Sequence, residues 1–186
     1  MALVGGNIIL ARRKFVQDRG GEALWERVLS HLPEADAKQL RRTLLVTQSY
    51  PLDVNLRLDQ AIARELHPGE PERAFLEMGR ASAEVNLTGP QKAFVREGDP
   101  HHLLSFAETI YAYYYGEGRR TYEKTGPTSA TLTTHDAPPC TPGDCLTVVG
   151  WHERAIELSG GQNPQVVETR CRSRGDLVCE YRCSWQ

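Results

Sequence analysis

The C-terminal stretch 168–186 contains three cysteines, Cys171, Cys179 and Cys183, which could be metal ligands, disulfide partners or small apolar residues of a hairpin. Cys179 and Cys183 are four residues apart on one predicted strand. That spacing separates them by roughly 13 Å, at about 3.3 Å per residue. Zinc holds its sulfur ligands at about 2.3 Å, so these two cysteines cannot bind the same ion. We therefore expect Cys183 to be a core residue.

Cys171 and Cys179 remain a candidate pair, because a turn at 173–176 brings them together across the predicted hairpin. Cys145, at the start of the preceding predicted helix, could join them, since a helix N-terminus favours a thiolate. Glu168 could supply an oxygen ligand. In a regular strand residues 168 and 171 point to opposite faces, so this set would require a bulge. The pattern leaves two alternatives open: a zinc site, or unliganded cysteines in the core.

The composition argues against some classes of function. The chain has 186 residues, of which 22 are basic and 24 acidic, and its formal net charge of −2 argues against a nucleic-acid-binding protein. No stretch approaches the roughly 20 apolar residues that span a bilayer. The N-terminus lacks the basic, apolar, small-residue order of a secretory signal. We therefore expect a cytoplasmic protein without stable disulfides, which leaves metal binding or burial for the cysteines.

The first two thirds of the chain show the apolar periodicity of helices. "RGG" at 19–21 ends the first predicted helix, Pro33 ends the second, and Asp99 caps the last, with Pro100 at its first position. We predict six helices, over roughly 8–16, 21–32, 33–45, 50–66, 71–87 and 99–118.

The fifth predicted helix carries a run of small residues that would let another backbone approach it closely. This run favours tight helix packing, with a cavity wall or a dimer contact as the alternatives. Its members are Gly79, Ala81, Ser82 and Ala83.

The periodicity changes after Gly118. Residues 120–126 and 129–136 alternate and are rich in Thr and Tyr, which predicts two strands joined by a turn. Residues 144–161 read as a further helix that Asp144 can cap, and 164–185 as a hairpin about "RGD". On the last strand one face carries the residues expected to be buried, Cys179, Tyr181, Cys183 and Trp185.

These elements predict an α+β fold in one domain, residues 1–186. A mainly helical layer, 1–117, would pack on a four-stranded antiparallel sheet. Residues 118–186 would run strand–strand–helix–strand–strand, with the helix between the two hairpins.

The C-terminal sequence resembles the end of a V4R (4-vinyl reductase) domain, in which a helix is followed by E-x-x-C and then by G-D-x-x-C and an aromatic residue. The zinc ligands of V4R sensor domains in phenol-responsive activators follow the spacing Cys-x22-Glu-x2-Cys-x7-Cys. The resemblance therefore implies a structural zinc ion here. The matching residues are Glu168, Cys171, Gly175, Asp176, Cys179 and Tyr181, and the implied ligands are Cys145, Glu168, Cys171 and Cys179.

The N-terminal two thirds resemble an uncharacterised family expanded in myxobacteria, on the segments 11–33, 50–69 and 78–87. Together the two resemblances imply the fold shared by V4R domains, haem nitric-oxide-binding domains and small subunits of the TRAPP vesicle-tethering complex. In that fold helices and an antiparallel sheet enclose a pocket for a small molecule or an acyl chain, and dimers are frequent.

The chain departs from its relatives at positions that set ligand specificity. The helix end "YAYYYGEG" has no His and "SATLTTHDA" has no Trp, so the phenol specificity of the V4R sensors does not carry over. The Tyr-x-Ser-x-Arg motif of the haem-binding relatives is also missing. His101, His102 and His152 are therefore expected to be surface or capping residues.

These observations predict a non-catalytic sensory module that binds a small hydrophobic, aromatic or acyl ligand, with zinc as structural support and a homodimer as the expected assembly. The alternative is a dimeric protein-interaction or scaffolding module without a ligand cavity. No dinucleotide fingerprint, nucleophile elbow or HExxH motif points to an enzyme. The candidate ligand-binding residues are Tyr111, Tyr114, Tyr115 and Trp151.

Overall fold

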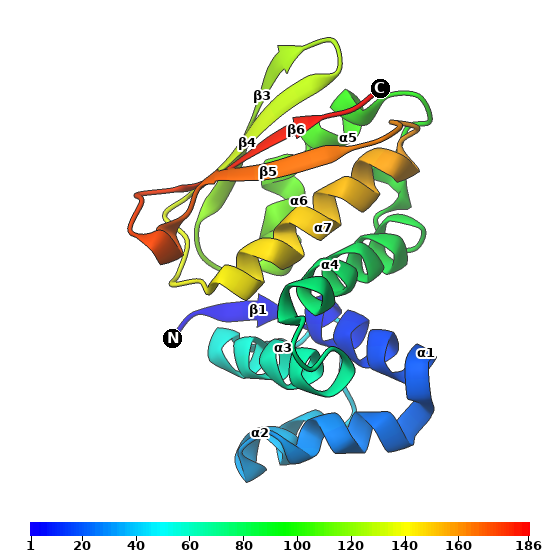
Figure 1. The fold of residues 1–186 in the computed structure, drawn as a ribbon, viewed down its shortest axis with the longest axis vertical. Helices are drawn as coiled ribbons and strands as arrows, with labels where there is room; N and C mark the ends of the chain where they lie inside the picture. The colour runs from blue at the N-terminus through cyan, green and yellow to red at the C-terminus, as the bar shows by residue number, and fades with distance from the viewer.

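The computed structural model describes all residues 1–186, and its elements are stacked in layers from a C-terminal sheet to an N-terminal helix pair (Figure 1). Next to the sheet lies α7, then α4, then α1 and α3, with α2 at the far end. None of the helices combines the length and the apolar character that crossing a membrane requires. The helices are α1 (Gly6–Ser30), α2 (Glu34–Leu40), α3 (Leu52–Leu66), α4 (Pro71–Leu87), α5 (Pro100–Ser105), α6 (Ala107–Tyr114) and α7 (Pro142–Leu158).

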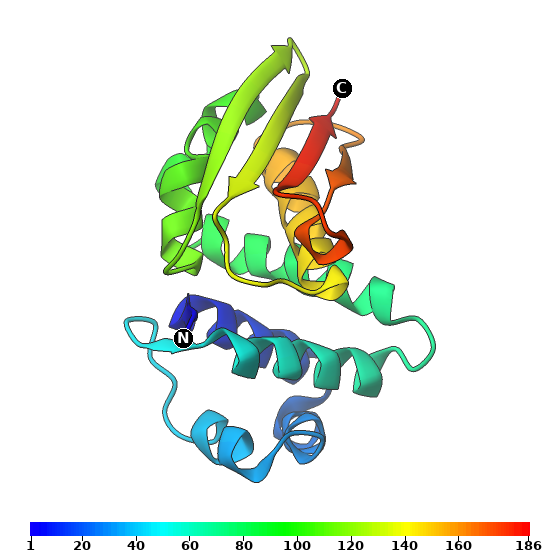
Figure 2. The ribbon, with the colours of Figure 1, turned by 90° about the vertical axis from the view of Figure 1, so that its left-hand side faces the viewer.

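The sheet is antiparallel throughout and has the order β3-β4-β6-β5. Helices α5, α6 and α7 cover one of its faces and leave the other to solvent (Figure 2). The covered face buries alternate residues of β6, as the sequence predicted. The predicted α+β arrangement, with a helix between two hairpins, is therefore confirmed. The strands are β3 (Arg119–Gly126), β4 (Ser129–His135), β5 (Gln165–Arg170) and β6 (Cys179–Ser184).

The helix boundaries differ from the prediction in three places, one of which is α2, which ends at Leu40 although the predicted helix ran to residue 45. The first and second predicted helices are one element, α1, which kinks where Gly20 and Gly21 leave helical geometry. Gly21 has a φ of 64°, a conformation that glycine adopts without steric cost. The predicted helix over 99–118 is in fact divided at Phe106 into α5 and α6, and Asp99 caps the first of them by accepting from the His102 N–H.

A further pair of short strands was not predicted. β1 (Leu3–Gly5) pairs with β2 (Ser49–Pro51), and this ribbon lies beside the start of α1 and α3. Each strand has three residues, which is too short to show an alternating pattern.

The small residues of α4 allow it to pack closely against α7. A Cβ atom on Gly79 would lie 2.0 Å from the carbonyl oxygen of Thr147, and one on Gly150 would lie 2.1 Å from that of Leu76. Both distances are far below van der Waals contact, so the two helices can approach this closely only with glycine at both positions. Tight helix packing is thus confirmed, and Gly79 and Ser82 also line a cavity.

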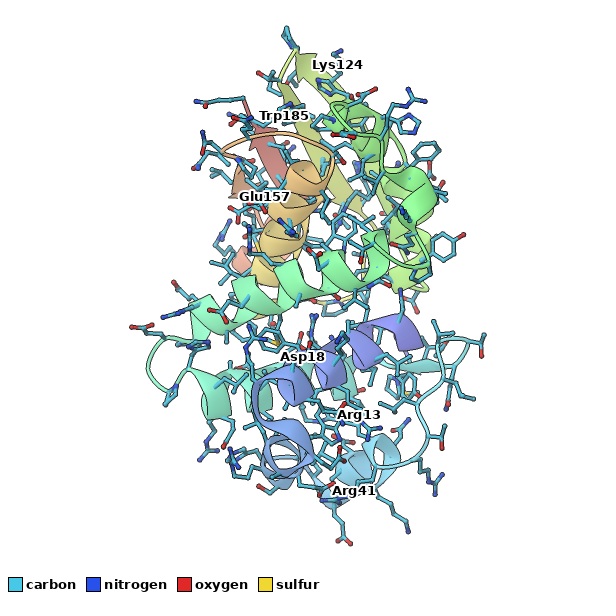
Figure 3. All side chains as sticks on the ribbon, turned by 90° about the vertical axis from the view of Figure 1, so that its right-hand side faces the viewer. Arg13, Asp18, Arg41, Lys124, Glu157 and Trp185 are labelled. Atoms are coloured by element: carbon cyan, nitrogen blue, oxygen red, sulfur yellow. The ribbon has the colours of Figure 1, made fainter.

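Side chains fill the spaces between the layers (Figure 3). Arg13, Asp18 and Arg41 lie in the half of the molecule formed by the N-terminal helices, and Lys124 and Trp185 lie at the sheet end. One apolar core cluster joins the N-terminal helices, while a second fills the space between α7 and the sheet.

Candidate functional site

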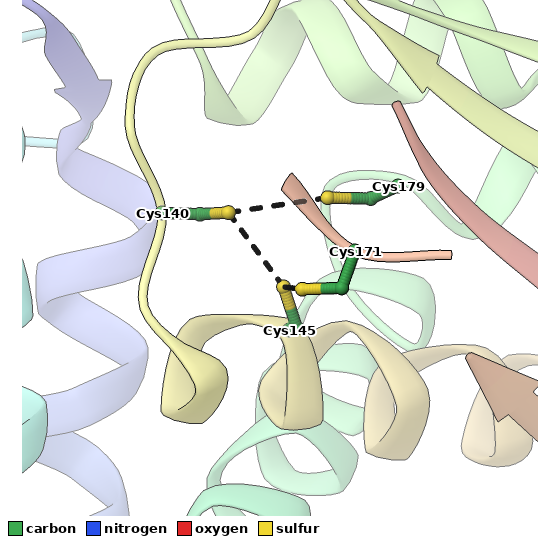
Figure 4. A group of neighbouring side chains, drawn as sticks. All are labelled: Cys140, Cys145, Cys171 and Cys179. Carbon is green, nitrogen blue, oxygen red and sulfur yellow. Dashed lines mark hydrogen bonds between the residues drawn. The ribbon is translucent and has the colours of Figure 1, made fainter. Parts of the chain in front are cut away.

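Four cysteines from four separate segments converge at one end of the sheet (Figure 4). Cys140 lies in the loop between β4 and α7, and Cys145 lies in the first turn of α7. Cys171 directly follows β5, and Cys179 begins β6. Cys145, Cys171 and Cys179 are buried, and Cys140 is partly exposed.

The spacing of the four sulfurs fits a metal site. Their separations are 3.9 Å between Cys140 and Cys179, 3.8 Å between Cys140 and Cys145, and 3.4 Å between Cys145 and Cys171. All four lie within 4.8 Å of one another. A tetrahedron of zinc–sulfur bonds of about 2.3 Å has edges of about 3.8 Å, whereas a disulfide bond is only about 2.05 Å long. The cluster therefore has the dimensions of a four-thiolate centre.

Local backbone features bring the four segments together. The Thr141 side chain accepts from the backbone N–H of Asp144 at 3.1 Å and so caps α7. Asp144, the predicted cap, lies instead inside the first turn and is buried. The pairing of β5 with β6 shifts register between Glu168 and Arg170, which provides the irregularity that the sequence pattern required.

Hydrogen bonds hold the cysteine segments in place. The backbone N–H of Arg172 donates to Cys179 Sγ at 3.3 Å, and that of Cys171 donates to Asp176 Oδ2 at 2.7 Å. Thiols of Cys140 and Cys145 donating to Cys179 lower the pKa of Cys179, while the same crowding raises the pKa of Cys145. Within the cluster negative charge is therefore favoured on Cys179 and disfavoured on Cys140 and Cys145.

Glu168, the predicted oxygen ligand, lies outside the sulfur cluster. Its Oε2 accepts from Arg174 Nη1 at 3.0 Å, and its buried Oε1 has no hydrogen-bond partner in the protein. Cys140 takes the fourth position. The sequence pattern did not lead us to include Cys140, although its spacing of five residues from Cys145 was an available signal. Cys183 is 2% exposed within the core, as predicted.

A second candidate site is a cavity of about 50 Å³ between the helical layer and the sheet. The four predicted ligand-binding aromatics, from α6, the residue after it, and α7, all line this cavity. The full lining is Ile8, Arg12, Gly79, Ser82, Leu103, Leu104, Ala107, Ile110, Tyr111, Tyr114, Tyr115, Arg120, Thr147, Val148, Trp151 and His152.

The polar atoms of these aromatic residues are all bonded within the protein. The Tyr111 hydroxyl donates to the Glu117 carbonyl at 2.9 Å, and Trp151 Nε1 donates to the Tyr114 hydroxyl at 3.1 Å. Tyr115 donates to Asp144 Oδ1 at 3.4 Å. Burial raises the pKa of Tyr111 to about 12, so its hydroxyl stays neutral. The aromatics therefore offer the cavity mainly apolar surface.

Three charged or titratable side chains also line the cavity. Arg12 forms a buried two-point ion pair with Asp59, at 2.7 and 3.1 Å. Arg120, on β3, is 9% exposed. His152 is 3% exposed, so its predicted surface or capping position is wrong; its Nδ1 lies 2.8 Å from the Val148 carbonyl oxygen, and burial lowers its pKa to about 3.

A smaller cavity of about 30 Å³ lies between the larger one and the cysteine cluster. Tyr111, Tyr115, Arg120 and Val148 line both cavities. The smaller one also reaches three of the clustered cysteines, Cys140, Cys145 and Cys179. The cysteine cluster and the aromatic cavity are therefore neighbours.

Comparisons with known proteins relate this chain to one family and one group of structures. Residues 14–186 match the family described as "Protein of unknown function (DUF2378)". No curated protein matches the sequence. Among solved structures, an H-NOX protein from S. oneidensis in the Fe(II)NO state has a TM-score of 0.72 at 16% identity, covering 98% of this chain and 99% of that one.

Two further H-NOX structures are similar. An H-NOX protein variant from K. algicida, in the Fe(II) unliganded state, has a TM-score of 0.67 at 12% identity, covering 98% of this chain and 96% of its own. An oxygen-binding H-NOX domain related to soluble guanylate cyclases has a TM-score of 0.70 at 12% identity, covering 98% of this chain and 95% of that one. At these identities the likeness establishes a shared fold.

Proposed function

The chain belongs to the DUF2378 family and has the H-NOX fold, and on this basis we propose that it is a non-catalytic sensory module that binds a small molecule and uses zinc as a structural support. The observation that carries the proposal is the cavity between the helical layer and the sheet, with its aromatic walls and few polar groups. Ligand sites in proteins typically combine apolar walls with a few placed polar groups.

Haem, which is present in structurally similar proteins of the H-NOX family, does not fit this cavity. Pockets for drug-sized ligands occupy about 300–1,000 Å³, whereas this cavity measures about 50 Å³. The rings that line the cavity pack on one another: Tyr111 and Tyr115 are stacked at 4.9 Å, and Tyr114 and Trp151 are in edge contact at 5.9 Å. We therefore propose a smaller ligand.

For zinc, the residues present fit the ion. Cys140, Cys145, Cys171 and Cys179 would hold it, and a zinc ion with four thiolate ligands has no open position for catalysis. Its role would be structural, tying the loop before α7, the start of α7 and the last hairpin together. This proposal keeps the zinc site that the V4R resemblance implies but replaces Glu168 with Cys140.

Binding of neutral probes tests the sensory function. We expect 1-butanol or phenol to raise the melting temperature of the zinc-loaded protein, because a ligand that binds only the folded state stabilises it. Ala107→Leu, which adds bulk at the cavity wall, should abolish this effect. Ala112→Leu is the matched control, because Ala112 lies on the same helix but is exposed.

Two outcomes would contradict the proposal: no probe binds, or Ala107→Leu and Ala112→Leu respond alike. A protein that binds no probe but forms a stable dimer in solution would instead support the scaffolding alternative.

A further inference from the structure

Arg120 carries a buried positive charge that forms no close ion pair within the protein, although the buried carboxylate of Asp144 lines the same smaller cavity. Its Nε donates to Thr134 Oγ1 at 3.0 Å, across the β3–β4 pair. Its two terminal nitrogens make no hydrogen bond to the protein, and no carboxylate oxygen lies within 4.0 Å of the guanidinium. A guanidinium has five N–H donors, so most of the hydrogen-bonding capacity of Arg120 is unused.

The other arginine of the cavity, Arg12, is paired with a carboxylate. Arg12 is also buried, but both oxygens of Asp59 accept from it. Around Arg120 the contacts are aromatic: its guanidinium carbon lies 5.1 Å from the ring centre of Tyr111 and 5.7 Å from that of Tyr181. These faces stabilise a cation without neutralising it. A buried charge is costly unless an opposite charge pairs with it.

The position of Arg120 places this charge at the ligand cavity. Arg120 lines both the cavity of about 50 Å³ and the smaller one of about 30 Å³. A water molecule needs about 10–15 Å³ of such space, so the larger cavity holds only a few non-hydrogen atoms. Leu103, Ile110 and Trp151 supply apolar surface there.

We propose that the ligand is a short-chain monocarboxylate, of about three to five carbons by this volume, whose carboxylate pairs with Arg120 and whose alkyl chain lies against Leu103, Ile110 and Trp151. Guanidinium and carboxylate groups form two parallel hydrogen bonds, which suits the free terminal nitrogens of Arg120. This inference deepens the proposed function and rests on it, since it names the chemical class of the ligand.

A matched pair of probes tests the inference on the unaltered protein. Butyrate and butyramide have the same size, but only butyrate is charged. We expect butyrate to bind the zinc-loaded protein at least tenfold more tightly at constant ionic strength, followed by NMR at the indole N–H of Trp151. Acetate and octanoate should both bind more weakly than butyrate, because one leaves the cavity partly filled and the other exceeds it.

A pair of variants tests whether Arg120 supplies the positive charge that binds butyrate. Arg120→Gln should remove the preference for butyrate over butyramide. Arg119→Gln should retain it, because Arg119 is the neighbouring residue on β3 but is exposed. If Arg120→Gln fails to fold, the butyrate and butyramide comparison on the unaltered chain still decides the question.

The outcomes separate this inference from the proposed function. Equal binding of butyrate and butyramide, or binding of 1-butanol without binding of butyrate, overturns the carboxylate assignment and leaves the sensory function standing. Retention of the butyrate preference in a folded Arg120→Gln variant also overturns it. If neither these probes nor the neutral ones bind, both proposals fail.

Discussion

The five cysteines differ in environment more than in burial. Cys183 lies among apolar neighbours of the sheet core, and burial raises the pKa of its thiol to about 12. Cys179, four residues earlier on the same strand, lies next to three other sulfurs. Substituting serine at the two positions therefore has different consequences: one change buries a hydroxyl group in the core, and the other removes a proposed metal ligand.

We predict that zinc analysis will distinguish the zinc-binding cysteines from Cys183, which does not bind the ion. The purified protein should contain close to one zinc per chain. Cys140→Ser should lose the metal and unfold at a much lower denaturant concentration, because zinc binding is coupled to folding. Cys183→Ser should keep the metal and lose only about 1–3 kcal/mol of stability, the cost of burying a hydroxyl.

Glu168→Gln is the control for the ligand set. Because the structure leaves this carboxylate outside the sulfur cluster, the variant should retain zinc. Loss of zinc in Glu168→Gln, with retention in Cys140→Ser, would restore the ligand set of the V4R sensors.

At the scale of elements, α7 connects the two candidate sites. Its first turn carries Cys145, its middle supplies Trp151 and His152 to the cavity, and its outer side packs against α4. A shift of this helix would move a proposed zinc ligand and a cavity wall together. The close approach at Gly79 and Gly150 restricts such a shift.

We predict that Gly150→Ala destabilises the protein. Within a helix alanine is favoured over glycine by about 1 kcal/mol, but a Cβ here would collide with the Leu76 carbonyl, and overpacking typically costs about 1–3 kcal/mol. Urea denaturation should therefore show a net loss of stability. Gly116→Ala is the control, since its nearest atoms lie at 3.7 Å. A stabilised Gly150→Ala variant would show that α4 and α7 are farther apart than described.

At the scale of the whole molecule, the cavity lies where the helical layer meets the sheet, and several ionisable groups are buried there. His152 contacts the Val148 carbonyl, and its ring stacks on Tyr181 at 6.3 Å. Arg120 adds a positive charge nearby, which together with burial disfavours the protonated imidazole. Acid should therefore weaken the junction between the layers.

We predict that stability falls as the pH drops below about 6.5. The pKa of His152 is about 3 in the folded protein, against an ordinary 6.5, so the unfolded chain binds more protons in between. Between pH 6.5 and about pH 3 the loss approaches about 1.4 kcal/mol per pH unit, and it ends below pH 3, where the folded protein also binds the proton. Urea denaturation at several pH values between 3 and 7 checks it: His152→Asn should flatten the dependence. An unchanged slope in His152→Asn would contradict the assignment.

The fold class could be derived from the sequence because it depends on local periodicity. Apolar spacing in 50–66 and 71–87 predicted α3 and α4, and alternation in 177–185 predicted which side of β6 is buried. The core position of Cys183 followed from strand geometry alone. Strands of three residues, and the division of a helix at Phe106, lie below the length at which such patterns are informative.

The composition of the sites depended on contacts between distant segments. Cys140 joins the cluster because the loop after β4 passes the start of β6, where Cys179 lies 39 residues farther along the chain. His152 is buried because α7 is covered on one side by α4 and on the other by the sheet. The unpaired charge of Arg120 is visible only once every carboxylate has been located. Periodicity along the chain thus determined the elements, and only their packing decided which side chains meet.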